Sequence, residues 1–329
     1  MVGRSRVVVV SRAGTDSMPE QSRRALEAVA EVTYVVRDRS MSKDDARLAL
    51  RGAAVVAATP LVVPQFDRRL LHSLPNLRGL AMYATGYDYL DVELLTEFGV
   101  TVSLLPHFAT ESVAEHAIAM LLGLSCRVHL ANDRSRGMTP ADVSLRGFEL
   151  RGRTLGVIGT GRIGSRVAEL ARAFGMRVLG HDPRVRQLPG VEQVGLRELL
   201  MRSDAVVLCC PYERGAPPVL GARELGWCRQ GAVVVNISRP TLVDNEAVAI
   251  ALRTRRLRGY AVDDAVFGLD AYGDLVREGR VLQTGHSAWW RDEALARGGV
   301  MWAEQIRRLA IGDPVDVIVP RPRVERLAG

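Results

Sequence analysis

The stretch TLGVIGTGRIGSRVAELARAFGMRVLGHD, residues 154–182, decides the fold. It opens with an apolar run, passes through Gly159, Gly161 and Gly164 in a G-x-G-x-x-G pattern, and continues with helical periodicity. In such a strand, turn and helix the first glycine permits the tight turn, and the second lets the backbone approach a pyrophosphate. The third allows the helix to pack closely on the strand. The stretch therefore predicts a dinucleotide-binding turn.

The end of the next apolar run indicates which dinucleotide is bound. Asp182 follows Gly159 by 23 residues, where its carboxylate can accept hydrogen bonds from both ribose hydroxyls. The pyrophosphate would lie at the helix N-terminus, where unpaired N–H groups favour negative charge. NAD is therefore favoured over NADP, although Arg184 could receive a 2′-phosphate if Asp182 turned away.

Apolar runs alternate with helix-like segments on both sides of this motif. This alternation is typical of parallel sheets covered by helices on both faces, so we expect an α/β protein of two Rossmann-like domains. We expect strands within 7–10, 32–36, 53–58, 77–85 and 100–105, and a second series within 154–159, 177–182, 205–210, 232–237, 259–264 and 280–285.

Three further segments complete the expected organisation. The residues from Glu111 to Leu130 are apolar on several faces and predict one long buried helix. Residues 131–151 are rich in Arg, Asp, Gly, Ser and Pro and predict a surface excursion. An amphipathic helix is expected from about Asp292 to Ile311.

The composition excludes several classes of protein. The 329 residues suffice for two domains, and 47% hydrophobic with 25% charged residues is ordinary for a globular chain. The net charge of +7 comes from arginines spread along the chain, which argues against nucleic acid as a partner. No apolar segment reaches about 18 residues, so no membrane partner is expected. The four cysteines lack metal spacing and are expected to be buried free thiols in the cytoplasm.

Five further motifs, taken with the glycine turn, carry a resemblance over nearly the whole chain. They are ATGYDYLD (84–91), ESVAEHAIAMLLGL (111–124), GAVVVNISRPTLVDNEAV (231–248), LRGYAVDD (257–264) and VLQTGHSAWWRDEAL (281–295). The sequence resembles the NAD-dependent D-isomer-specific 2-hydroxyacid dehydrogenase family, nearest the branch that contains the C-terminal-binding proteins. The resemblance implies a homodimer and an NAD-binding domain, residues 106–289, inserted into a flavodoxin-like substrate domain, residues 1–105 and 290–329.

The resemblance also implies an active site. Arg239 matches the arginine that holds the substrate carboxylate and carbonyl, for which a planar guanidinium is suited. His286 matches the acid/base histidine, and an imidazole titrates in the range that this task needs. Thr85 and Gly86 match the loop that binds the substrate carboxylate, and Trp289 matches a residue that faces the substrate.

Further positions are expected to bind the cofactor, and no metal is expected. Asp263 matches the aspartate at the carboxamide end of the nicotinamide. The predicted cofactor-binding residues are Gly159, Gly161, Arg162, Ile163, Gly164, Asp182, Cys210, Pro211, Ile237 and Asp263.

Three positions depart from the family pattern. Pro240 stands where a glycine usually follows the arginine, and Gly285 stands where a proline usually precedes the histidine. Gly268 occupies the place of a glutamate that pairs with the histidine, and Asp270 is a nearby acid that could replace it. Without a carboxylate partner less of the imidazole is protonated at neutral pH, which disfavours reduction relative to oxidation.

The sequence thus predicts an oxidoreductase that transfers a hydride between nicotinamide and a small 2-hydroxy or 2-keto acid. A second interpretation is a catalytically weak NAD(H)-binding dimer that acts as a sensor or scaffold. Retention of both Arg239 and His286 favours the enzyme. A Rossmann enzyme of another reaction type, such as an alanine dehydrogenase or a homocysteine hydrolase, is disfavoured by the order of the motifs.

Overall fold

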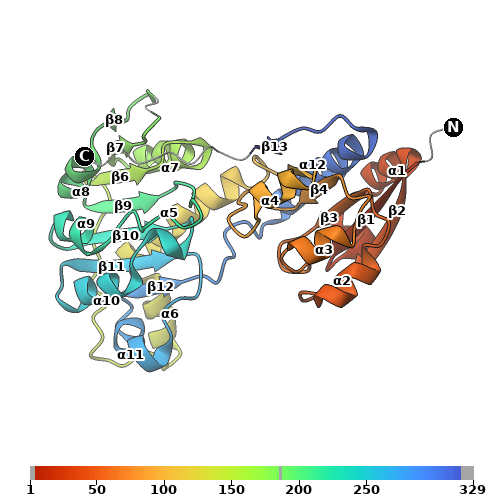
Figure 1. Cartoon of the computed structure of the whole chain (residues 1–329). Helices are drawn as coiled ribbons and strands as arrows, with labels where there is room; N and C mark the ends of the chain where they lie inside the picture. Colours follow the sequence, from red (N-terminus) through yellow and green to blue (C-terminus); the bar gives the residue numbers. More distant parts are fainter. Residues whose placement is uncertain (1–3, 185–186, 320–329) are drawn as a thin grey trace. The chain divides into compact units, whose positions relative to one another are not determined.

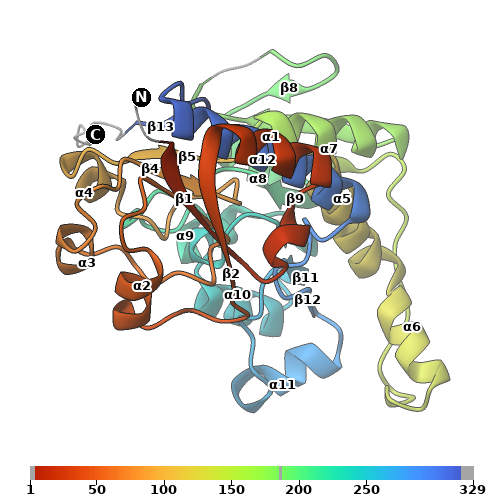
Figure 2. The same ribbon diagram turned by 90° about the vertical axis from the view of Figure 1, so that its right-hand side faces the viewer.

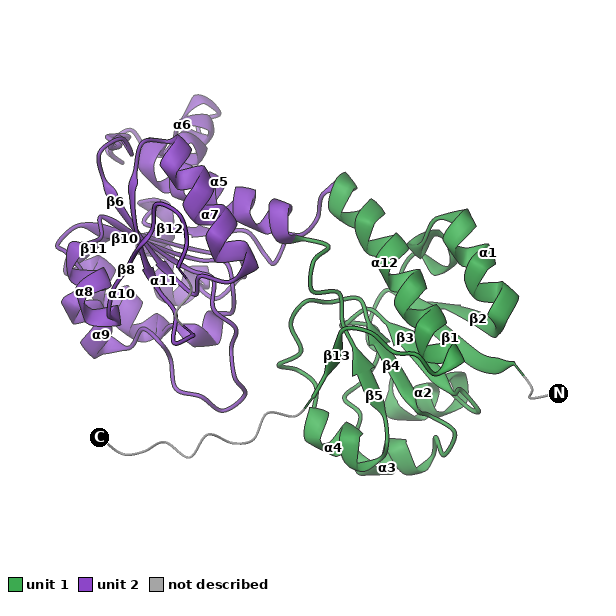
Figure 3. Cartoon of the chain, turned by 90° about the horizontal axis from the view of Figure 1, so that it is seen from above, with its two compact units in different colours: residues 1–109, 292–329 green, residues 110–291 purple. Residues whose placement is uncertain are grey.

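The computed structural model describes residues 4–184 and 187–319, which fold as two compact units (Figure 3). Unit 1 comprises residues 1–109 and 292–329, and unit 2 comprises residues 110–291. The chain passes between the units after Ala109 and again after Arg291. Each unit contains its own mainly parallel sheet with helices packed against it, which confirms the predicted fold class.

Unit 1 has a six-stranded sheet in the order β13-β5-β4-β3-β1-β2, and all its pairings are parallel except that of β13 with β5. Its strands are β1 (Ser5–Ser11), β2 (Ala30–Val36), β3 (Val55–Ala58), β4 (Gly79–Met82), β5 (Thr101–Ser103) and β13 (Val317–Ile318). Its helices are η1 (Gly14–Ser17), α1 (Glu20–Val29), α2 (Lys43–Ala49), α3 (Arg68–His72), α4 (Val92–Glu97) and α12 (Asp292–Ile311).

The valine run of β1 explains how this sheet is buried. Val8 and Val10 belong to the apolar cluster that also contains residues of α2, α3 and α4. Successive side chains of a strand point to opposite faces, so Val7 and Val9 point to the other face, where α12 contacts β1, β3 and β4. All four valines have no exposed surface, and a strand covered on both faces reads as an unbroken apolar run.

Unit 2 has a seven-stranded parallel sheet in the order β12-β11-β10-β9-β6-β7-β8 (Figure 1). Its strands are β6 (Thr154–Ile158), β7 (Arg177–His181), β8 (Glu192–Gln193), β9 (Ala205–Leu208), β10 (Ala232–Asn236), β11 (Leu257–Val262) and β12 (Val281–Gln283). Its helices are α5 (Thr110–Cys126), α6 (Val128–Ser135), α7 (Arg162–Ala173), α8 (Leu196–Arg202), α9 (Ala222–Trp227), η2 (Pro240–Leu242), α10 (Asn245–Arg253) and α11 (Leu269–Arg277).

Two apolar layers enclose the sheet of unit 2. Helices α5 and α7 pack against each other and against one face, with Leu121 and Val167 fully buried. Helices α8, α9 and α10 contribute residues to the layer on the other face, which includes Leu252 and Tyr260. The chain leaves β6 toward β7 and β8 and then returns to add β9 on the other side of β6. In open α/β sheets ligands bind at such a switch point, beyond the carboxyl ends of the strands.

The prediction of one helix from Glu111 to Leu130 is wrong. Helix α5 ends at Cys126, and α6 starts at Val128 after a bend of 62°. The carbonyl of Ser125 accepts the backbone N–H of Phe148 at 2.9 Å, so a loop occupies the acceptor that a continued helix would use. Arg127 between the helices has a left-handed backbone with φ 54°.

Residues 131–151, expected to form a surface excursion, begin with the last turn of α6, which continues to Ser135. Figure 2 shows α6 and the loop after it reaching away from the rest of unit 2. Within the described ranges no single helix is long and apolar enough to span a membrane. The bent pair α5 and α6, taken together, has the length and composition of a membrane-spanning segment.

The expectation of buried cysteines is wrong for one residue. All four cysteines are free, but Cys126 at the end of α5 is exposed, whereas Cys228 is buried and Cys209 and Cys210 are partly buried.

Candidate active site

The predicted site residues of unit 2 follow the carboxyl ends of neighbouring strands. Asp182 follows β7, Gly159 follows β6, Arg239 follows β10 and Asp263 follows β11, with His286 just beyond β12. Because all these strands are parallel, their carboxyl ends form one edge of the sheet. Along this edge, the residues expected to bind the adenosine end of the cofactor come first, and those expected to lie at its nicotinamide end follow.

The three glycines of the turn have distinct structural roles. Gly159 has φ 89°, and a Cβ there would lie 2.7 Å from the backbone nitrogen of Cys210. A Cβ at Gly164 would lie 1.9 Å from the carbonyl oxygen of Gly159, so the start of α7 packs directly on the turn. Gly161 is the N-cap of α7, and none of the described atoms outside its immediate neighbours lies within 4 Å of a Cβ built there. The space beside Gly161 suits a pyrophosphate at the helix N-terminus.

The other cofactor positions lie around this turn. Arg162 is the first residue of α7. Ile163 is partly buried and packs against the apolar layer to which α5 and α7 contribute. Cys210 and Pro211 follow β9, and Ile237 follows β10 and is buried. Burial raises the pKa of the Cys210 thiol to about 11, so it is a neutral lining group.

Arg239 stands on a turn that Asn236 shapes. The buried Asn236 side chain donates to the carbonyl of Arg239 at 2.8 Å and accepts the backbone N–H of Ser238 at 3.1 Å. Pro240, the first departure from the family pattern, begins the short helix η2. A proline is well tolerated there, because the first residue of a helix needs no N–H partner within the helix. The departure therefore preserves the turn.

His286 stands on a turn held by a buried carboxylate. Asp263 is 7% exposed, and its Oδ1 accepts the hydroxyl of Thr284 at 2.7 Å and the backbone N–H of Ser287 at 2.8 Å. Its Oδ2 accepts the backbone N–H of Ala288 at 3.1 Å. A buried carboxylate needs such partners to remain charged, and this one binds both sides of His286.

The backbone at His286 is in an unusual conformation. Gly285 and His286 have φ values of 60° and 61°. A left-handed backbone costs a residue with a side chain about 1–2 kcal/mol, so the hydrogen bonds to Asp263 offset a local strain. Proline cannot adopt such a φ, which explains why Gly285 replaces the family's proline here. The indole of Trp289 donates to the carbonyl of His286 at 3.1 Å and further fixes the turn.

In the region of the missing glutamate, no described carboxylate makes a hydrogen bond to His286. Gly268 is the N-cap of α11, and Asp270 lies exposed in the first turn of that helix. Within residues 4–184 and 187–319, no carboxylate is hydrogen-bonded to the ring of His286, and no group of three or more potential metal ligands occurs.

The remaining predicted substrate residues belong to unit 1. Thr85 and Gly86 lie in the loop after β4, and the Thr85 hydroxyl donates to the carbonyl of Leu105 at 3.0 Å. Trp290 precedes α12, is 59% exposed, and its ring contacts that of Trp289 edge to face.

Sequence reasoning missed a second layer of polar residues around the turn. His116 of α5 contacts both Thr284 and Arg291 at 3.0 Å. Burial lowers the pKa of His116, with a further lowering by Arg291 that the attraction of Asp263 opposes. A single histidine within the apolar run of α5 was the available signal, but its partners come from residues more than 160 positions away.

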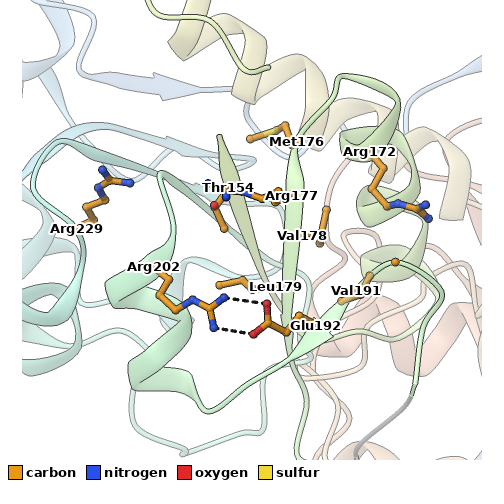
Figure 4. Close-up of a pocket in the computed structure, with 11 residues that line it drawn as sticks. Thr154, Arg172, Met176, Arg177, Val178, Leu179, Val191, Glu192, Arg202 and Arg229 are labelled. Carbon is orange, nitrogen blue, oxygen red and sulfur yellow. Dashed lines mark hydrogen bonds and ion pairs between the residues drawn. The ribbon is translucent and has the colours of Figure 1, made fainter. Parts of the chain in front are cut away.

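A separate cavity of about 800 Å³ lies at the opposite edge of the sheet (Figure 4). It is lined by the first residues of β6 and β7, Thr154 and Arg177, and by an ion pair between Arg202 and Glu192 at 2.7 Å. These amino ends face away from the glycine turn, so this cavity is not the cofactor site.

The carboxyl edge of the unit 2 sheet, with its glycine turn, Arg239 and His286, is that of a nicotinamide-dependent dehydrogenase, and comparison with known proteins agrees. Residues 118–288 match the family model for the NAD-binding domain of D-isomer-specific 2-hydroxyacid dehydrogenases. The chain belongs to the D-isomer-specific 2-hydroxyacid dehydrogenase family. The predicted enzyme class, an NAD-dependent oxidoreductase acting on a CH–OH group, is thereby confirmed over the sensor interpretation.

Individual relatives support the family assignment. The chain is 34% identical over 281 residues to a glyoxylate reductase of Aeropyrum pernix, covering 80% of this chain and 83% of that protein. It is 29% identical over 317 residues to a D-3-phosphoglycerate dehydrogenase of Methanocaldococcus jannaschii, covering 94% of this chain but only 59% of that longer protein. The D-lactate dehydrogenase of Escherichia coli has a similar structure, with a TM-score of 0.78 and 28% identity over 95% of this chain and 100% of that one.

Proposed function

We propose that the protein interconverts a small 2-keto acid and its 2-hydroxy acid at the carboxyl edge of unit 2, with unit 1 as the substrate domain. One observation carries the proposal: Asp263 at the end of β11 clamps the turn of His286, while Arg239 follows the neighbouring strand β10. The nicotinamide supplies or receives the hydride. Arg239 holds the carboxylate and polarises the carbonyl, Trp289 contacts the substrate, and Thr85 and Gly86 are the unit 1 residues expected to bind its carboxylate.

In the reduction His286 donates its ring proton to the oxygen of the former carbonyl, and in the oxidation it takes the proton back. Within the described residues no carboxylate is hydrogen-bonded to the ring of His286, so no charged partner stabilises the imidazolium that donates this proton. Oxidation is therefore the relatively favoured direction. The substrates named for relatives, glyoxylate and D-lactate, set the size expected here.

The test is turnover of the purified protein with NADH and a panel of glyoxylate, pyruvate and hydroxypyruvate, and with NAD and the corresponding hydroxy acids. His286→Ala should lower kcat by about 10²-fold or more while the Kd for NADH changes little. Arg239→Gln should raise KM and lower kcat together. If both variants keep native turnover, the assignment of these residues is wrong.

We also infer that the protein works as a homodimer in the cytoplasm. Val128 of α6 and Met138 in the following loop are each 62% exposed, and large exposed apolar side chains on a projecting segment favour a partner surface. The four free thiols suit a reducing compartment. Light scattering should give the dimer mass, and Val128→Glu combined with Met138→Glu should give monomers; a native monomer at micromolar concentration would exclude the dimer.

A further inference from the structure

A chain of hydrogen bonds connects helix α5 to the turn that carries His286. The Nη2 of Arg291 lies 3.0 Å from the Nδ1 of His116, and the Nε2 of His116 lies 3.0 Å from the Oγ1 of Thr284. The Thr284 hydroxyl in turn donates to the Oδ1 of Asp263 at 2.7 Å. All these residues belong to unit 2.

The direction of each hydrogen bond follows from the chemistry of the groups. A hydroxyl has one proton, and Thr284 gives its proton to the carboxylate of Asp263, so its oxygen accepts from His116. The Nε2 of His116 must therefore carry a hydrogen. A guanidinium has no acceptor, so the Nδ1 of His116 accepts from Arg291 and carries none. His116 is thus fixed as the neutral Nε2–H tautomer.

The surroundings of His116 maintain this neutral form. Its side chain is 9% exposed, and the charged groups that face it are Asp263, at 3.7 Å, and Arg291. Burial, assisted by Arg291, lowers the pKa of His116 despite the attraction of Asp263. A second ring proton would point at the guanidinium and break the chain of hydrogen bonds at its first contact.

We propose that His116 is a positioning residue that acts through Thr284 and Asp263 to hold His286 in the orientation needed for proton transfer. The inference rests on the proposed role of His286. Three acceptor positions of Asp263 are filled by the turn, and His116 fixes the Thr284 hydroxyl that fills one of them. Losing His116 should therefore misalign His286 without removing any group expected to touch the cofactor.

Three single variants and one double variant test this chain of hydrogen bonds. His116→Leu removes both hydrogen bonds and should lower kcat for keto-acid reduction at least tenfold, with the Kd for NADH unchanged within twofold. His116→Gln retains a donor for Thr284 and should recover kcat to within threefold of the native value. Thr284→Val breaks the next contact, and the double variant with His116→Leu should lose no more activity than the worse single variant.

The pH profile separates positioning from a purely structural role. Protonation of His286 favours reduction, so a fall in kcat at acid pH must come from another group. We expect such a fall in the native protein, as His116 gains a proton, and its absence in His116→Gln. His72→Gln, at an exposed histidine of α3 in unit 1, is the matched control and should keep the native profile.

Three outcomes overturn the inference. Nitrogen NMR of histidine-labelled protein should show His116 as the Nε2–H tautomer at neutral pH, and an Nδ1–H or cationic form would contradict it. If His286→Ala is impaired but His116→Leu and Thr284→Val keep native kcat, the positioning role is wrong and the proposed function stands. If His286→Ala is fully active, the proposed function fails and the role of His116 fails with it.

Discussion

The backbone N–H of Thr160 donates to the Oδ2 of Asp182 at 2.9 Å, so the residue expected to select the cofactor also braces the glycine turn. The Oδ1 of Asp182 accepts the backbone N–H of Arg184 at 3.0 Å. These contacts orient the carboxylate in the free protein. Asp182 is therefore expected to repel a 2′-phosphate in addition to supporting the turn.

Asp182 variants should separate these functions. Asp182→Asn retains an acceptor for Thr160 but removes the charge, so the preference for NADH over NADPH should fall by about tenfold, or about 1.4 kcal/mol. Asp182→Ala also loses the hydrogen bond to the backbone of Thr160 and should therefore weaken the binding of NADH as well. The ratio of kcat/KM for the two cofactors measures the effect, and equal use of both by the native protein would refute the assignment.

Gly161 and Gly164 provide a matched pair of glycines. Gly164→Ala puts a methyl group 1.9 Å from the Gly159 oxygen, so it should destabilise the fold by about 1–3 kcal/mol or more. Gly161→Ala has room in the free protein and should leave the thermal midpoint nearly unchanged while raising the Kd for NADH at least tenfold. Tight NADH binding by Gly161→Ala would show that the pyrophosphate lies elsewhere.

The cysteines should differ in reactivity as their burial differs. Burial raises the pKa of both Cys210 and Cys228 to about 11, so little thiolate forms at neutral pH. Cys126 is exposed and should react first with iodoacetamide at pH 7.5, as peptide mass spectrometry would show. Modification should leave NADH binding intact. Faster labelling of Cys210 than of Cys126 would contradict this order.

Gly285 should tolerate alanine better than proline. Its φ of 60° costs an alanine about 1–2 kcal/mol, whereas the ring of proline excludes that angle. Gly285→Pro restores the family residue, yet here it should lower kcat by more than tenfold because the turn of His286 must rearrange. Native kcat in Gly285→Pro would mean that the left-handed conformation is dispensable.

The sequence predicted the elements that depend on local pattern. The buried strands of both sheets read as apolar runs, and the amphipathic helix Asp292–Ile311 is found where its periodicity placed it. Features that depend on distant residues were missed. The break at Arg127 arises because Phe148 takes the Ser125 carbonyl, and the partners of His116 come from segments after β11 and β12. Periodicity contains no information about either contact.

The absent glutamate gives the most direct test of how His286 works. Gly268 is exposed, and a Cβ built there meets no described atom within 4 Å apart from its chain neighbours, so the first side-chain carbon of Gly268→Glu has room. A carboxylate that reaches the imidazole would stabilise its protonated form. In its proposed role, His286 must be protonated for reduction and neutral for oxidation. We therefore expect reduction by Gly268→Glu to persist to higher pH, and oxidation to begin at higher pH, than in the native protein.

The controls for Gly268→Glu distinguish charge from bulk. Gly268→Gln adds a similar side chain without a carboxylate and should keep the native pH profiles in both directions. Asp270→Asn should also keep them, because Asp270 has no contact with the ring of His286. If Asp270→Asn lowers turnover and shifts reduction to lower pH, Asp270 is the substitute partner. If Gly268→Glu and Gly268→Gln give the same pH profiles, the added carboxylate does not reach His286. In that case the conformation of the His286 turn, which Gly285 and Asp263 set, holds the imidazole too far from residue 268.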